Sequence, residues 1–144
     1  MMYYDTMPLG DLVQVLKDRI SRRSGLRQSW STVGGRPIVT LTKKGSGSPV
    51  AIEVNDEYFI VQTADGYWSI EWAAPNIPDE QSQTFDELLD DLTKYLEGRY
   101  QVEVTRGLFG RTSRFLKIGG PDGGRTFVRR KRGYFPPDVL PNDE

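Results

Sequence analysis

The spacing of hydrophobic residues switches twice between a helical period and a strand alternation, and this pattern constrains the fold more than any other feature of the chain. The first helical segment predicts an amphipathic helix over about residues 8–23. Its apolar side chains are Leu9, Leu12, Val13, Leu16 and Ile20. A second helix is predicted from a capping box formed by Thr84 and Glu87 to a stop at Gly98. Its apolar side chains are Phe85, Leu88, Leu89, Leu92 and Leu96.

Alternating apolar and polar residues predict strands before and after the second helix. Those before it are residues 37–43, 49–55, 57–63 and 67–73. Those after it are residues 100–106, 114–118 and 125–131. The Ser- and Gly-containing stretch before residue 37 is expected to be a connector, and residues 73–83 a loop. Asp65-Gly66 suits a type I′ turn.

Short turns between consecutive strands favour an α+β fold in which two amphipathic helices pack on an antiparallel sheet, in the order α-ββββ-α-βββ. We expect one domain over residues 1–133 and a flexible, Pro-rich, acidic tail over residues 134–144. Alternation also predicts core faces on two of the strands. These faces are Val50, Ile52 and Val54 on one strand, and Trp68, Ile70 and Trp72 on another.

The 144 residues include neither cysteine nor histidine. This excludes disulfides, thiolate catalysis, and Ser/His or Cys/His nucleophile arrangements. A chain of this length can bury a core without a metal or a disulfide, so no cofactor and no metal are expected. The first ten residues lack the pattern of a secretory signal, and no stretch approaches the roughly 20 apolar residues that span a bilayer. We therefore expect a cytoplasmic protein with no membrane partner.

Charges are segregated along the chain, although the net charge is only −1. Residues 51–93 carry 11 acidic and no basic side chains, whereas residues 1–50 carry 8 basic and 3 acidic, and residues 94–132 carry 11 basic and 3 acidic. Either the acidic and basic segments pack side by side and neutralise each other, or one of them is a docking surface that steers a partner of opposite charge. If the acidic helix packs directly beside basic segments, the docking argument loses its main support.

The first candidate surface is acidic and is expected to bind a basic protein. Carboxylates on the strands and on the second helix accompany two tyrosines, a composition typical of binding hot spots. The candidate residues are Glu53, Asp56, Glu57, Tyr58, Asp65, Tyr67, Glu71, Asp86, Glu87, Asp90 and Asp91. The simpler alternative is that the tyrosines are partly buried sheet residues and the carboxylates only solvate a helix.

The second candidate surface is basic and lies on the C-terminal strands. Arginines interleaved with Phe115, Phe127 and Tyr134 would suit a nucleic acid, whose phosphates attract cations and whose bases stack on aromatic rings. The candidate residues are Arg114, Lys117, Arg125, Arg129, Arg130, Lys131 and Arg132, with Arg106 and Arg111 nearby. Two observations oppose this hypothesis: edge strands often carry cations merely to prevent aggregation, and the sequence pI is only about 5.6.

Catalysis has little support in the sequence. Phosphate-binding loops and nucleophile motifs are absent, and no spacing singles out a carboxylate pair, although Glu53 and Glu71 could in principle act as acid and base. The rows Asp86/Asp90 and Glu87/Asp91 could hold a hard cation, but adjacent carboxylates on a helix are more often simply solvated. We therefore expect a protein that is not an enzyme.

The element order is similar to that of small α+β immunity and secretion-chaperone domains of bacteria, which bind a toxin or an effector protein and do no chemistry. This resemblance is one of architecture, and it implies no site residue. The leading hypothesis is a non-enzymatic protein-binding module, like an immunity protein, antitoxin or chaperone, that docks a basic partner through the acidic face. The alternatives are a nucleic-acid-binding domain that uses the basic strands, and an assembly subunit whose exposed strand edges engage copies of itself or a neighbouring chain.

Overall fold

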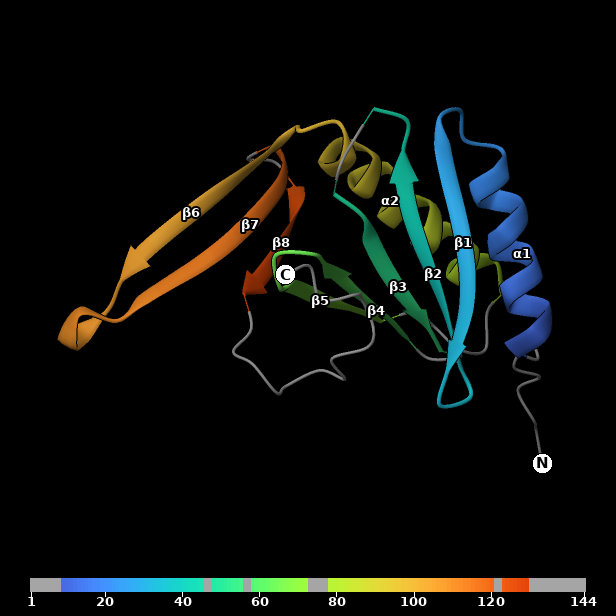
Figure 1. Cartoon of the computed structure of the whole chain (residues 1–144), viewed down its shortest axis with the longest axis horizontal. Coiled ribbons are helices and arrows are strands. Elements are labelled where there is room, and N and C mark those ends of the chain that lie inside the picture. The colour runs from blue at the N-terminus through green and yellow to red at the C-terminus, as the bar shows by residue number, and fades with distance from the viewer. Residues whose placement is uncertain (1–8, 46–47, 56–57, 73–77, 121–122, 130–144) are drawn as a thin grey trace.

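A computed structural model describes residues 9–45, 48–55, 58–72, 78–120 and 123–129 (Figure 1). Two helices pack on one eight-stranded antiparallel sheet in this part of the chain, so the predicted α+β class is confirmed. The elements are α1 (Leu9–Ser21), β1 (Leu26–Val33), β2 (Arg36–Lys43), β3 (Val50–Val54), β4 (Tyr58–Thr63), β5 (Tyr67–Trp72), α2 (Pro78–Leu96), β6 (Tyr100–Arg106), the 3₁₀ turn η1 (Leu108–Gly110), β7 (Thr112–Gly120) and β8 (Gly123–Arg129). The strand order in the sheet is β1-β2-β3-β4-β5-β8-β7-β6, which makes β1 and β6 the two edges.

The segment expected to connect the first helix to residue 37 contains strand β1, so that prediction is wrong. Gly34 and Gly35 have φ angles of 58° and 78° and join Val33 to its partner Arg36 as a two-residue hairpin turn. Left-handed backbone at both central positions is the type I′ geometry, which matches the twist of the flanking strands. Serines and glutamine weaken the strand pattern of β1, whereas the Gly-Gly pair marks its end.

Helix α2 begins at Pro78, before the predicted capping box, so the expected start at Thr84 is wrong. Thr84 lies inside the helix and is half-buried. A proline fits the first helical position because its missing N–H has no partner there, and Asp79 and Glu80 follow in the first turn, where the helix dipole favours acidic residues. Residues 73–77 of the expected loop lie outside the described residues.

The turn between β4 and β5 differs from the predicted type I′. Gly66 donates its N–H to the Thr63 carbonyl at 3.1 Å and has a φ of 88°. Phe109 is the one non-glycine residue with a positive φ in the part of the chain that the structure describes, so Asp65 is not left-handed. The hairpin therefore uses a type I turn followed by a left-handed glycine.

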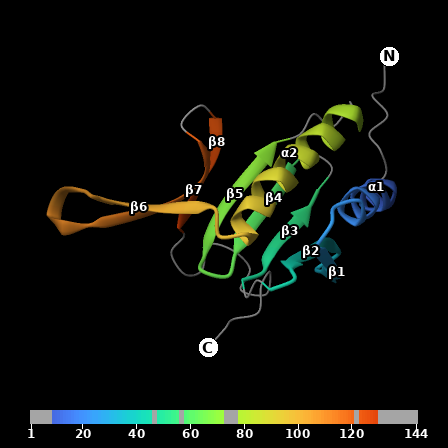
Figure 2. The same ribbon diagram turned by 90° about the horizontal axis from the view of Figure 1, so that it is seen from above.

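Both helices lie on the same face of the sheet (Figure 2), and the main core fills the space between them and the strands. The predicted apolar face of α2 is confirmed, since every member is buried. Leu12, Leu16 and Ile20 of α1 are buried too, and so are Val50, Ile52 and Val54 of β3. The Phe59 ring of β4 packs against Phe85 of α2, with ring centroids 5.3 Å apart.

On β5, the face predicted to be core is the one that points away from the helices. Phe59 pairs with Glu71 in the β4–β5 register, so Glu71 and Tyr67 share the helix-covered face. Tyr67 is buried, whereas Ile70 is 36% exposed and Trp68 is half-buried. The Trp72 side chain lies outside the described residues. The prediction is wrong because alternation identifies two faces of a strand but not the one that a helix covers.

Candidate functional site

The predicted acidic residues do not form one surface. Glu53 lies on the sheet face opposite the helices, as its pairing with Ile38 in the β2–β3 register shows. Its side chain is only 4% exposed, and it accepts a hydrogen bond from Arg36 at 2.8 Å. A buried carboxylate needs such a partner, because desolvation of an unpaired charge is costly. The expectation that Glu53 belongs to an exposed face is therefore wrong.

The remaining strand residues of the acidic set are scattered. Tyr67 is buried and Tyr58 is half-buried, as in the simpler alternative for these tyrosines. Asp65 is exposed at the β4–β5 turn. Asp56 and Glu57 lie outside the described residues.

The carboxylates of α2 face the basic end of α1. Arg19 forms an ion pair with Asp86, and Arg23 forms one with Asp90. Arg23 also donates to the main-chain carbonyl of Asp86 at 3.1 Å. These pairs tie the two helices together, so Asp86 and Asp90 are occupied within the chain. Glu87 is exposed beside Gln83.

Arg125 of β8 joins two further acidic candidates. It forms an ion pair with Glu71 of β5, and its Nε donates to Asp91 Oδ2 of α2 at 3.0 Å. Its side chain is 13% exposed and those of the two carboxylates are 20% exposed. Burial alone would lower the pKa of Arg125, but the two carboxylates outweigh it and raise the pKa. Arg125 is therefore a structural cross-link between sheet and helix rather than a free contact for nucleic acid.

Intramolecular pairing thus accounts for much of the charge segregation. The acidic segment lies between basic groups of α1 on one side and of β8 on the other, and both sets of groups contact α2. The carboxylates of Glu71, Asp86, Asp90 and Asp91 are thus occupied within the chain, and an acidic docking face loses its main support.

Strands β6 and β7 extend from the body as a two-stranded arm (Figures 1 and 2). They pair continuously from Tyr100 with Ile118 to Arg106 with Thr112. Leu116 and Ile118 are buried and fix the root of this β6–β7 arm in the core, whereas every residue of β6 is exposed. An isolated two-stranded hairpin is marginally stable in water, so an arm of this kind gains stability from a partner.

The tip of the arm presents two apolar side chains to solvent. Leu108 is 84% exposed and Phe109 is 98% exposed. Phe109 has left-handed backbone angles (φ 65°, ψ 25°), which cost a non-glycine residue roughly 1 kcal/mol. Gly107 donates its N–H to the Arg111 carbonyl at 2.6 Å and closes the turn.

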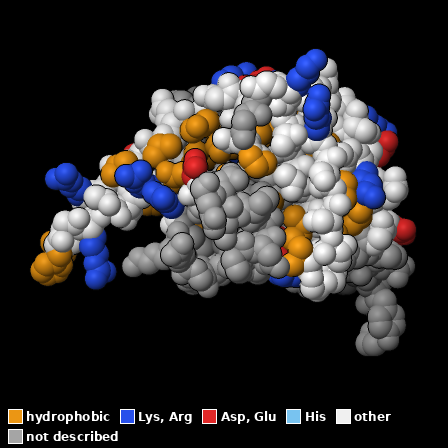
Figure 3. Space-filling model, in the orientation of Figure 1, with side chains coloured by type: hydrophobic (Ala, Val, Ile, Leu, Met, Phe, Trp, Pro, Cys, Tyr) orange, Lys and Arg blue, Asp and Glu red, His pale blue; other side chains and the backbone are white. Residues whose placement is uncertain are grey.

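An apolar row connects the tip to the body. Tyr100, Val102 and Val104 lie on one face of β6 and are 40%, 46% and 52% exposed. In Figure 3 this row and the tip are seen as orange patches along the arm. Of the seven large hydrophobic residues that are exposed in the described segments, five belong to the arm. Exposed apolar residues gathered in this way mark an interaction site.

Cations flank the apolar row. Arg106, Arg111 and Arg114 are exposed and have no ion pair among the described residues, and Arg106 and Arg111 directly flank the tip in the sequence. Lys117 differs, because it pairs with Glu103 across the two strands at 2.7 Å. Arg129 of β8 is exposed too, whereas Arg130, Lys131 and Arg132 lie outside the described residues.

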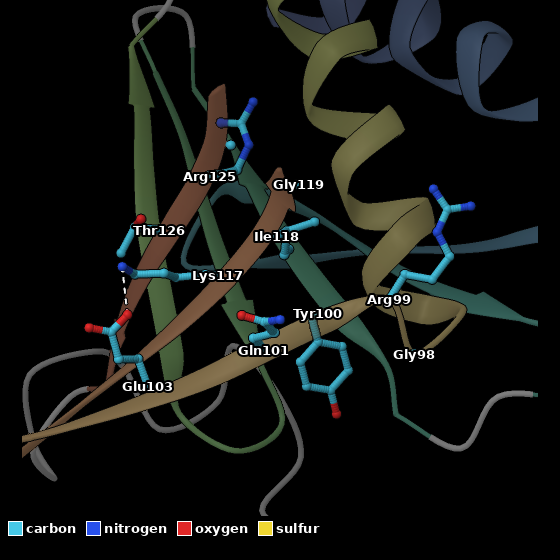
Figure 4. Close-up of a pocket in the computed structure, with 11 residues that line it drawn as sticks. Gly98, Arg99, Tyr100, Gln101, Glu103, Lys117, Ile118, Gly119, Arg125 and Thr126 are labelled. Carbon is cyan, nitrogen blue, oxygen red and sulfur yellow. Dashed lines mark ion pairs between the residues drawn. The ribbon is translucent and has the colours of Figure 1, made fainter. Parts of the chain in front are cut away.

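A pocket of about 820 Å³ lies at the root of the arm between β6, β7 and β8 (Figure 4). Lys117 and Glu103 face each other on one side of it, and Arg125 lies farther along β8. Because the carboxylate and all three cations that line this pocket already have ion-pair partners, its chemistry points to no reaction.

The aromatic residue beneath this root is Tyr95 of α2, whose ring lies 4.8 Å from that of Tyr100 between centroids. Burial, followed by the nearby Asp65 carboxylate, raises the pKa of Tyr95 from 10 to about 12. Below pH 10 the Tyr95 hydroxyl is protonated in both the folded and the unfolded chain. Between pH 10 and 12 the unfolded chain ionises first, so folding stability falls as the pH rises.

We expect wild type to lose up to about 2 kcal/mol more stability than Tyr95→Phe between pH 9 and pH 11.5. Urea unfolding of both proteins at the two pH values measures this difference, and the other tyrosines and lysines cancel in the comparison. Equal losses in the two proteins would show that the Tyr95 hydroxyl titrates alike in the folded and unfolded chains.

Neither a metal site nor a spanning helix is found in the part of the chain described. No group of three or more acidic side chains there is arranged to hold a metal ion. In the carboxylate rows of α2, Asp86 and Asp90 form ion pairs with arginines. None of the helices in these segments has the length and hydrophobicity to cross a membrane.

Comparison with models of protein families, with curated proteins and with solved structures finds no match. The chemistry of the arm therefore carries the functional argument. Leu108 and Phe109 were not among the site residues predicted from the sequence. A signal was present, since two apolar residues stand between Gly107 and Gly110 where a hairpin turn normally carries polar residues.

Proposed function

We propose that this protein is a non-enzymatic protein-binding module whose docking element is the β6–β7 arm. The observation that carries the proposal is the row of exposed apolar side chains on an arm that projects from the body, ending in Leu108 and Phe109. A monomeric protein rarely exposes such a row, because apolar surface in water costs about 25 cal/mol per Å². Burial against a partner recovers this free energy.

The partner chemistry follows from the composition of the arm. Leu108 and Phe109 suit an apolar recess, and Arg106, Arg111 and Arg114, which have no ion pair within the described segments, suit carboxylates around its rim. Rim charges of this kind steer encounter and fix orientation. The partner is thus an acidic-rimmed protein surface, in contrast to the basic partner expected for the acidic face.

A second candidate function, nucleic-acid binding, is favoured by the same unpaired arginines. A two-stranded ribbon fits the major groove, and apolar side chains can wedge between base steps in the minor groove. The valines of β6 favour protein over nucleic acid, since phosphates offer them no apolar surface. Affinity that falls steeply with salt would mark the nucleic-acid alternative.

The proposal predicts that the double variant Leu108→Ser/Phe109→Asn loses protein partners. Truncation of a binding hot spot costs 2 kcal/mol or more, so we expect retention to fall by at least about tenfold. Asparagine tolerates left-handed backbone, so the fold of the turn is kept. The measurement is quantitative mass spectrometry of proteins retained from native lysate, after nuclease treatment, by tagged wild type and variant.

Ile70→Ser is the matched control, because Ile70 is also an exposed hydrophobic residue but lies on β5. It should retain partners as wild type does, and circular dichroism should show that all three proteins are folded at the temperature of the retention experiment. Equal retention by wild type and the double variant would refute the arm as docking element. Retention of nucleic acid, with every protein lost after nuclease treatment, would favour the second candidate.

A further inference from the structure

We propose that the free edge of β6 pairs with β6 of a second copy of this chain, antiparallel and about a two-fold axis at Glu103, so that one sheet runs through both copies. This inference goes beyond the proposed function, because it assigns the edge of β6 to a second copy and leaves Leu108 and Phe109, which lie outside the paired residues 100–106, to the acidic-rimmed partner. Three features of β6 support this pairing. Its outer edge has no partner among the described strands, its sequence is complementary to itself, and the charge of its central residue, Glu103, is neutralised by Lys117.

The hydrogen bonds between β6 and β7 determine which backbone groups of β6 are left free. Among the described strands, β6 has β7 as its sole neighbour. The Gly107 N–H donates to the Arg111 carbonyl, so these two residues form a hydrogen-bonded pair. Along an antiparallel ladder, such pairs alternate with pairs that exchange no backbone hydrogen bonds. In the register of the arm, Gln101, Glu103 and Thr105 therefore direct their backbone groups toward β7. The other residues of β6 direct N–H and C=O outward; these are Tyr100, Val102, Val104 and Arg106.

Three of the four outward residues form the apolar row, so one partner strand can satisfy the backbone and also contact these side chains. About a two-fold axis at Glu103, Val102 lies opposite Val104 of the second copy, and Tyr100 lies opposite Arg106. The first pair is apolar on both sides, and the second sets a guanidinium beside an aromatic ring. The overlap uses the whole strand from residue 100 to residue 106, with no overhang.

The centre of the axis places Glu103 opposite its own copy, which by itself would be repulsive. Each Glu103 carries its own counter-ion, however, because Lys117 of the neighbouring strand lies 2.7 Å away. The two copies together make a four-charge cluster with no net charge, in which the two carboxylates lie at the centre and each keeps its own lysine. The repulsion between the two Glu103 carboxylates is therefore offset by the lysine that each copy already holds beside its own carboxylate.

Edge strands that avoid pairing carry a proline, a bulge or charged side chains, lysine above all. Strand β6 has no proline, lysine or bulge, and its two charged residues are Glu103, which is paired with Lys117, and Arg106 at the end of the strand. The opposite edge, β1, is closed in part by α1: Lys17 lies 5.5 Å from the Trp30 ring, and Gln28 donates to the Lys17 carbonyl at 3.1 Å. The accessible edge of this sheet is therefore β6.

The test uses the absence of native cysteine. Non-bonded antiparallel pairs have Cα atoms about 4.5 Å apart, a separation that a disulfide can span. With Glu103→Cys we expect most of the full-length protein to become covalent dimer under mild oxidation, read on a non-reducing gel. The matched control is Ser113→Cys, which is exposed on β7 away from the edge and should give about a tenth as much dimer or less.

Register is tested by mixing two single variants. Gln101→Cys and Thr105→Cys face each other across the proposed axis, so their mixture should cross-link while either alone stays largely monomeric. Sedimentation of wild type should show a concentration-dependent dimer, and Val104→Lys should shift it to monomer at the same concentration. Lysine at this exposed edge position leaves the core unchanged.

Two results would overturn the two-fold pairing. One is a wild-type protein that stays monomeric at every concentration, and the other is a dimer in which Glu103→Cys forms no more disulfide than Ser113→Cys. The proposed function is refuted by a different result, which is equal retention of protein partners by wild type and the Leu108→Ser/Phe109→Asn variant. If the Leu108→Ser/Phe109→Asn variant still loses protein partners in the retention experiment, the arm docks another protein, and only the second copy is refuted.

Discussion

Replacing Phe59 with alanine is expected to lower the free energy of unfolding by about 4 kcal/mol. Phe59 is fully buried on β4, and its ring packs against Phe85 of α2 at a tilt of 58°. The substitution removes this contact and leaves a cavity between the central strands and the helix, and a close-packed core closes such a cavity only in part. A domain stable by 5–15 kcal/mol would lose a large share of its stability.

Urea unfolding at pH 7 measures the loss, with Phe109→Asn as the matched control. Phe109 is the same residue type at 98% exposure, so its replacement should change stability by no more than about 0.5 kcal/mol. A loss of less than about 1.5 kcal/mol for Phe59→Ala would mean that the strand and the helix do not pack as described.

Replacing Arg125 with methionine should cost about 3 kcal/mol. The guanidinium is the shared partner of Glu71 on β5 and Asp91 on α2, and all three side chains are largely shielded from solvent. Without the cation, two carboxylates face each other in a poorly solvated gap. Methionine keeps most of the apolar stem, so the loss reports on the charge rather than on packing.

Arg129→Met on the same strand is the control, because Arg129 is exposed, and it should change stability by at most about 0.5 kcal/mol. Adding Glu71→Gln and Asp91→Asn to Arg125→Met should recover at least half of the loss, since the two carboxylates no longer repel each other, while the side chain of Lys94, which lies 3.9 Å from Asp91, is 37% exposed and stays solvated. Equal stability of wild type and Arg125→Met would show that this cross-link is solvated and contributes nothing.

The sequence alone predicted the fold class because hydrophobic period is a local property. The apolar faces of both helices and of β3 were correct, since side chains three, four or two residues apart share a face whatever surrounds them. The errors arose where the local signal was weak. Polar β1 was missed although Gly34 and Gly35 mark its hairpin, and the start of α2 was placed at Thr84 because a capping box resembles a helix start even inside a helix.

The candidate site was less predictable, because it depends on which segments meet. Charge counts along the chain established that acidic and basic segments are separated, but pairing between them is a long-range property. Only the tertiary structure placed Arg125 between Glu71 and Asp91, and Arg19 and Arg23 against α2. The sequence likewise defined the alternation of β6, while the sheet order determined that β6 is an edge and that Leu108 and Phe109 lie beyond the core. Local spacing specifies faces, and the fold determines which faces are covered.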